Sequence, residues 1–241
     1  MAKKDFYVII DTETTQNSLV ADFGAVVADR QGRVLETFAV MVDGVYTDKD
    51  ESPLFHIFGD SGDLWSKKGL PKRYQAYDKM LENGSRTLAR VPAINRWLER
   101  INAQYKPYIT AYNFPFDRSK CQNTGIDLTI FKDRNFCLWS ASIAKWGGNK
   151  RFRQFCLEQH AFNSPTQHGN MTFKTNAEVM CRFVLNDPEM PDEPHTSLED
   201  ALFYELPILK KLLATTPKNK IINAESYNWR NFQVKDAFKA K

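Results

Sequence analysis

Cysteine is scarce in this chain of 241 residues, and the few cysteines present lie far apart. They are Cys121, Cys137, Cys156 and Cys181, and none belongs to a C-x-x-C pair. Structural zinc sites usually draw on such pairs, and disulfide frameworks need a higher density of cysteine in a shorter chain. We therefore expect neither kind of site, and a fold that depends on a packed apolar core.

A long apolar run and a strong excess of charge are also missing. The apolar run nearest the N-terminus, Phe6–Ile10, is too short for the core of a signal peptide and for a membrane span. We therefore expect a soluble cytoplasmic protein with no membrane partner. The chain has 33 basic and 29 acidic residues, a formal charge of +4. Such an excess is compatible with a polyanionic partner but does not establish one.

Internal repeats and low-complexity tracts are absent as well. Hydrophobic residues make up 42% and charged residues 26% of the chain, which is ordinary for a globular protein. This composition predicts a single domain over residues 1–241. Residues 43–90 show no sustained period, so we expect an irregular or partly helical excursion there. Its aromatic residues argue against disorder.

Short apolar runs predict a sheet that begins with three antiparallel strands. These runs are Phe6–Ile10, Asp22–Ala28 and Val34–Val42, with a turn at residues 29–32 between the last two. Later segments alternate between helical and strand patterns: helix at Pro92–Ile101, strand at Pro107–Ala111, helix from Pro115, strand at Asn135–Trp139, and helices at Asn176–Leu185 and Ser197–Leu213. The order predicts an α/β fold with a mixed sheet and helices on its faces.

Two acidic residues stand where the first strand ends. Asp11 and Glu13 are two positions apart, so in an extended chain both side chains point to one side. Paired carboxylates at a strand end are suited to Mg²⁺ or Mn²⁺, which prefer oxygen ligands. The alternative is that D-x-E is a common tripeptide of solvent-exposed turns.

A third acidic residue, Asp117, is expected in the first turn of the helix that follows Asn113. The helix dipole alone favours an acidic residue there, so this position does not by itself indicate a metal ligand.

The last acidic candidate, Asp200, lies five residues after His195. Asp200 borders an apolar stripe that includes Leu202, where an unpaired carboxylate is costly unless it binds a metal. We expect Glu199 to form a capping box with Thr196.

The remaining acidic and histidine residues receive a structural interpretation. Glu205 is expected on a solvated helix face. His56, His160 and His168 are expected in surface or loop positions.

In combination, these segments resemble a known family. The motifs DTETT, YNFPFD and HTSLEDA occur in the order found in the DEDDh 3′–5′ exonucleases, which belong to the DnaQ-like group of the ribonuclease H-like superfamily. The resemblance implies a ribonuclease H-like mixed five-stranded sheet, with three antiparallel strands followed by parallel strands, flanked by helices. The chain departs from the family at Gln16, where Gly is common, and at Tyr112, where His is common.

The resemblance also implies an activity: hydrolysis of DNA or RNA from the 3′ end, with release of nucleoside 5′-monophosphates. Two Mg²⁺ ions, or Mn²⁺ as a substitute, would be held about 3.5–4 Å apart. The implied metal ligands are Asp11, Glu13, Asp117 and Asp200. His195 would be the general base, for which an imidazole is suited near neutral pH.

Substrate contacts are expected in two places. Thr14, Thr15, Asn113 and Phe114 border the expected site. Basic residues interleaved with aromatic ones could follow phosphates and stack on bases, or simply form a solvated face: Lys145, Lys150, Arg151 and Arg153. We expect residues 43–90 to encode substrate preference.

Other functions remain open at this point. A non-catalytic nucleic-acid-binding module would use the same fold, and a proofreading subunit would use the same chemistry beside a polymerase. An endonuclease of the wider superfamily would also need an acidic cluster, although the spacing of His195 and Asp200 favours the exonuclease branch. A homodimer is possible, because similar exonucleases dimerise.

Overall fold

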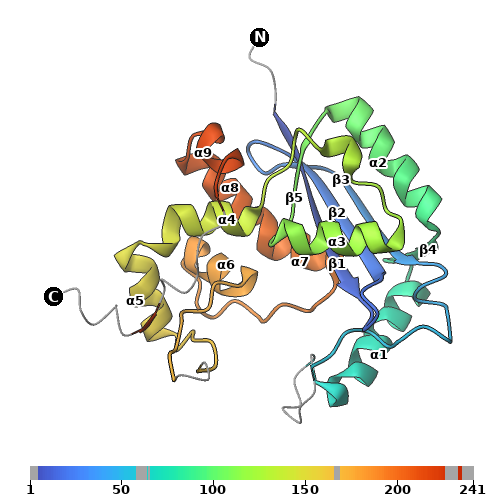
Figure 1. The fold of residues 1–241 in the computed structure, drawn as a ribbon, viewed down its shortest axis with the longest axis horizontal. Helices are drawn as coiled ribbons and strands as arrows, with labels where there is room; N and C mark the ends of the chain where they lie inside the picture. Colours follow the sequence, from blue (N-terminus) through green and yellow to red (C-terminus); the bar gives the residue numbers. More distant parts are fainter. Residues whose placement is uncertain (1–4, 58–63, 65, 166–168, 226–232, 235–241) are drawn as a thin grey trace.

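A five-stranded mixed sheet in the order β4-β3-β2-β1-β5 organises the protein (Figure 1). Strands β1 (Phe6–Thr14), β2 (Val20–Asp29) and β3 (Val34–Val42) form the predicted antiparallel meander. The two edge strands are short and parallel to their neighbours: β4 (Thr87–Ala89) beside β3, and β5 (Tyr108–Thr110) beside β1. The predicted fold class is thus confirmed, and the arrangement is compatible with a ribonuclease H-like sheet.

The computed structural model describes most of the chain. The described residues are 5–57, 64, 66–165, 169–225 and 233–234. The helical segments are η1 (Lys67–Gly69), α1 (Leu70–Glu82), α2 (Val91–Tyr105), α3 (Phe114–Thr124), η2 (Thr129–Phe131), α4 (Leu138–Ser142), η3 (Ile143–Gly147), α5 (Lys150–Glu158), α6 (Ala177–Leu185), α7 (Ser197–Asp200), η4 (Ala201–Glu205), α8 (Leu206–Thr215) and α9 (Lys218–Ile222). None of the described helices has the length and apolarity needed to cross a membrane.

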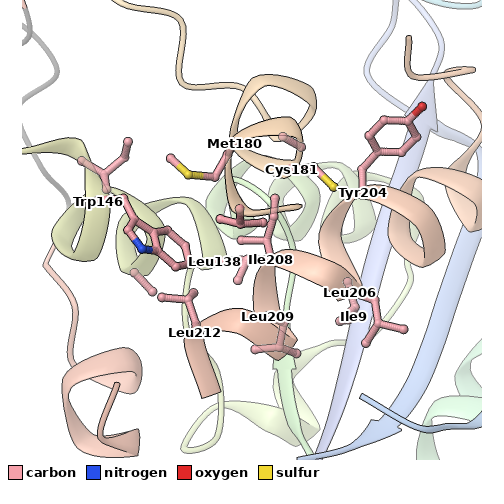
Figure 2. Packing of buried hydrophobic residues seen from close by; sticks show 14 of the residues in the cluster. Ile9, Leu138, Trp146, Met180, Cys181, Tyr204, Leu206, Ile208, Leu209 and Leu212 are labelled. Carbon is pink, nitrogen blue, oxygen red and sulfur yellow. The ribbon is translucent and has the colours of Figure 1, made fainter. Parts of the chain in front are cut away.

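The two faces of β1 belong to different cores, as expected for a central strand. Val8 and Ile10 pack with residues of α2 and α3. Tyr7 and Ile9 lie on the other face, among residues of α4, α6 and α8. Figure 2 shows Ile9 in this cluster with Leu138, Met180 and Leu209. Asp11 and Glu13 continue the alternation of Tyr7 and Ile9, which directs both toward the α7–α8 side of the sheet.

The strand predicted at Asn135–Trp139 is wrong. Asn135 forms only an isolated bridge with Ile109, and α4 begins three residues later. The amide of Leu138 donates to Ala111 O at 3.1 Å, and from there the backbone turns into helical bonding. The fifth strand is instead β4, within the segment 43–90, which was expected to be irregular or partly helical and also contains η1 and α1.

The helix predicted at Ser197–Leu213 is a helical run of three segments in the structure. It passes from α7 through the π-helical turn η4 into α8, which ends at Thr215. Pro207 accounts for the change: proline has no N–H to donate, and its ring collides with the carbonyl of the preceding turn in a regular α-helix. The wider π-turn just before it is one way in which helices accommodate such a residue.

Candidate functional site

A cleft of about 360 Å³ opens at the carboxyl end of β1. Its walls come from β1, the start of α3, the start of α6, and the segment from residue 193 to residue 205. Six carboxylates line it: Asp11, Glu13, Asp117, Glu193, Asp200 and Glu205. The four carboxylates expected from the sequence therefore share one cleft with His195, which also lines it.

Asp117 reaches the cleft from the first turn of α3. Asn113 precedes this helix with φ of 71°, a left-handed conformation that asparagine tolerates better than most residues. This residue turns the chain from β5 into α3, although its side chain makes no capping hydrogen bond. The Asp117 carboxylate is buried and accepts a hydrogen bond from Thr12 Oγ1 at 2.9 Å, which ties α3 to β1.

Close contact between α7 and β2 places Asp200. A Cβ atom at Gly24 would lie 2.3 Å from the backbone nitrogen of Leu198, so only glycine allows this approach. The Ser197 amide donates to Asp22 Oδ2 at 2.9 Å, which satisfies one of the free N–H groups at the start of α7. Asp200 is consequently held over β1.

His195 stands just before α7 with φ of 56°. Its backbone carbonyl accepts a hydrogen bond from the Tyr77 hydroxyl of α1 at 3.3 Å. One ligand atom each from Glu13, His195 and Asp200 lie within 4.8 Å of one another. Carboxylate oxygens and an imidazole nitrogen at such a spacing can share a divalent cation; we call these residues the Glu13–His195–Asp200 group.

Asp11 and Asp117 lie in the same cleft, outside that group. Burial raises the pKa of Asp11 to about 7, and the nearby charge of Asp22 adds to the effect. Burial, followed by the charge of Asp11, raises the pKa of Asp117 well above its usual range. Both carboxyl groups therefore bind protons more readily than an exposed aspartate does, unless a cation compensates their charge.

The pKa values of both carboxyl groups in the Glu13–His195–Asp200 group are raised as well. Burial and the charge of Asp11 raise the pKa of Asp200 to about 11. Burial also raises the pKa of Glu13, although the Arg73 guanidinium opposes the shift from 2.7 Å away.

Three buried carboxylate oxygens in the cleft lack a hydrogen-bond partner within the described part of the chain. They are Asp11 Oδ2, Asp200 Oδ1 and Glu205 Oε2. Leaving a buried acceptor unsatisfied costs about 1–3 kcal/mol, and more for a charged group. A hard divalent cation satisfies several such oxygens at once. The residues present thus fit Mg²⁺ or Mn²⁺.

No protein-family model matches this chain, and no curated protein matches it. The function is accordingly proposed from the residues of the cleft and their arrangement.

Two carboxylates of the cleft were missed from the sequence. Glu205 was expected on a solvated face, which is wrong: its side chain is 2% exposed. Glu193 lies in the irregular segment between α6 and α7, where no periodic pattern marks it. A carboxylate shortly before His195 and another five residues after Asp200 were the only signals in the sequence.

Buried arginines support the site from the segment 43–90, and they too were missed. Arg73 donates from Nη2 to Glu13 and from Nη1 to Phe55 O, each at 2.7 Å. Arg86 is fully buried and binds both Asp22 and Glu199. The predicted capping role of Glu199 is therefore wrong, because α7 has no side-chain cap and this carboxylate pairs with Arg86.

Of the four substrate contacts predicted at the border of the site, two line the cleft and two do not. Thr14 and Asn113 line the cleft. Phe114 is 4% exposed and belongs to the core beside α3. Thr15 lines a separate pocket with Leu54.

Two other aromatic rings lie at the cleft instead. Phe55 and Phe116 line it and are 40% and 45% exposed. Lys120 also lines the cleft, with Nζ 4.7 Å from the centre of the Phe116 ring.

The predicted basic residues lie on η3 and α5, beyond α6 from the sheet (Figure 1). Lys145 Nζ donates to Thr215 O at 3.1 Å. Lys150 and Arg151 line a separate pocket with Phe155 and Phe183, and Arg153 follows on the same helix. The structure does not bring these residues together with the carboxylates.

The other histidines are also located. His56 was expected at the surface or in a loop; it lies in a loop but is 8% exposed, and its Nδ1 is 2.8 Å from Gln16 Nε2. His160 is exposed, as predicted, and His168 lies outside the described residues.

Proposed function

We propose that this protein is a 3′–5′ exonuclease that hydrolyses phosphodiester bonds of DNA or RNA from the 3′ end and releases nucleoside 5′-monophosphates. The observation that carries the proposal is the convergence of Asp11, Glu13, Asp117 and Asp200 on one cleft with His195. These residues come from β1, α3, α7 and the loop before α7, in the chain order of the family that the sequence resembles.

Asp11, Glu13, Asp117 and Asp200 would hold two Mg²⁺ ions, with Mn²⁺ as a substitute. Bound cations would supply activation of the attacking water and stabilisation of charge on the phosphate and the leaving 3′-oxygen. The carboxylates orient the cations and offset their charge. Their burial keeps them away from bulk water, where competing solvation would weaken these interactions.

His195 would take the proton of the attacking water at a ring nitrogen. Its side chain belongs to the Glu13–His195–Asp200 group, so it lies beside the expected reaction centre. Its carbonyl is held by Tyr77, which anchors the loop while the ring remains partly accessible. A partly exposed imidazole can then pass the proton to solvent between cycles.

Phe55, Phe116 and Lys120 would bind the terminal nucleotide at the rim of the cleft. Exposed aromatic rings stack on bases irrespective of sequence, and an ammonium group compensates a phosphate. The volume of about 360 Å³ lies at the small end of ligand pockets, which favours a single terminal nucleotide over a duplex.

The test is degradation of 5′-labelled single-stranded DNA and RNA with Mg²⁺, in parallel with EDTA and with Asp11→Asn, which keeps the size of the side chain but removes its charge. Glu158→Gln, on the exposed side of α5, is the matched control. We expect a ladder that shortens from the 3′ end in the wild type and the control, and none with EDTA or Asp11→Asn. Binding of both oligonucleotides without any shortening would instead indicate a non-catalytic binding module or a proofreading subunit that needs its polymerase.

A further inference from the structure

Glu205 is a buried carboxylate that the four-carboxylate scheme does not use. It is 2% exposed and lines the same cleft as Asp11 and Asp117. Among the described residues it forms no ion pair, whereas Glu13 has Arg73 and Glu199 has Arg86. A buried carboxylate without a counter-ion is unfavourable, so its presence needs an explanation.

The π-turn η4 explains how Glu205 reaches the cleft. In a regular α-helix successive residues are about 100° apart, so residues 200 and 205 would point about 140° away from each other. A π-turn pairs residues five apart, which brings Glu205 toward the face of Asp200. Such turns inside α-helices are frequent at functional sites.

The Glu205 carboxylate is buried in the cleft without a hydrogen-bond partner, among the described residues, for one of its oxygens. The backbone N–H of Tyr112, the second residue after β5, opposes the rise in the pKa of this carboxyl group that burial causes. The oxygen without a partner in the part of the chain that the structure describes is Oε2, which is buried. Glu205 lines the same cleft as Asp11 and Asp117, and the negative charges of both raise its pKa.

We infer that Glu205 supplies a further carboxylate oxygen to a divalent cation in this cleft, beside Asp11 and Asp117. The inference rests on the proposed metal-dependent function and adds a ligand to the four that the resemblance implies. An added anionic ligand raises the affinity of a site for hard cations.

Mn²⁺ binding to the full chain tests this inference without reference to activity. Free Mn²⁺ is measured by electron paramagnetic resonance during titration of the wild type, Glu205→Gln and the control Glu158→Gln. We expect Glu205→Gln to weaken at least one Mn²⁺ site by about 10-fold or more, and Glu158→Gln to bind as the wild type does. Glu205→Asp, which keeps the charge but shortens the side chain, should weaken the same site and serves in place of Glu205→Gln should that variant fail to fold.

The outcomes separate the two proposals. Equal Mn²⁺ affinity and stoichiometry in the wild type and the Glu205 variants would overturn the inference on Glu205 and leave the metal centre intact. Absence of Mn²⁺ binding in the wild type would overturn the metal centre itself, and the role of Glu205 with it.

Discussion

Replacing Arg73 should destabilise the protein far more than replacing an exposed arginine of the same segment. Arg73 is 2% exposed at its side chain and binds Glu13 at 2.7 Å, and it also donates to Phe55 O. Removing one partner of a buried ion pair costs about 3–5 kcal/mol, because the other charge is left uncompensated. For a chain of this size, each kcal/mol lowers Tm by roughly 2–4 °C, so Arg73→Met should lower Tm by about 6–20 °C.

Circular dichroism melts in EDTA provide the measurement, and Arg90→Met provides the control. Arg90 pairs with Asp43, but its side chain is 82% exposed, and exposed pairs contribute about 0–1 kcal/mol. The double variant Arg73→Met/Glu13→Gln should regain part of the loss, since it removes the uncompensated charge. Mg²⁺ should likewise restore part of the Tm of Arg73→Met. Equal Tm values for Arg73→Met and Arg90→Met would refute the reasoning.

Three further predictions concern protonation, the general base and substrate binding. In EDTA, the free energy of unfolding should fall as pH rises from about 4 to 8, because the folded-state pKa values of Asp11 (about 7) and Glu193 (about 8) exceed the unfolded values. Mg²⁺ should reduce this dependence of stability on pH. Thermal melts that show stability rising over this pH range would contradict the prediction. His195→Ala should keep its Tm and lose about 10²–10⁴-fold in kcat, and near-wild-type turnover would remove His195 from the role of base. Phe116→Ala should weaken single-stranded DNA binding by about 1–3 kcal/mol in a fluorescence titration. Phe203→Ala should not, because Phe203 is even more exposed than Phe116 but lies outside the cleft.

The sequence predicted the centre of the fold and the site because both depend on local signals. Apolar runs mark β1 and β2, which are buried along most or all of their length, and β3, whose last three residues are buried. The end of the first run locates Asp11 and Glu13 without further information. The edge strand β4 has three residues, of which two are exposed. It is therefore too short and too exposed to show the apolar pattern of a strand.

What the sequence did not reveal depends on tertiary contacts. Glu205 was assigned to a solvated face under the period of a regular helix, and the π-turn changes that period. Arg73 and Arg86 lie in a segment without periodicity, and cations are ordinarily exposed. Only the positions of Glu13 and Asp22 after folding explain why these arginines are buried.

Arg73, Tyr77 and Arg86 limit which parts of this protein can be exchanged with those of a related protein. Arg73 binds Glu13, and Tyr77 donates a hydrogen bond to the carbonyl of His195. Arg86 binds both Asp22 and Glu199. A chimera that exchanges the whole segment to alter the choice between DNA and RNA would remove the supports of the carboxylates together with the rim of the cleft. Conversely, if the three short motifs were placed in another protein of this fold, their carboxylates would lack the ion pairs with Arg73 and Arg86. An exchange confined to residues 43–57, which includes Phe55 and leaves the two arginines in place, is the one that could change specificity separately from assembly.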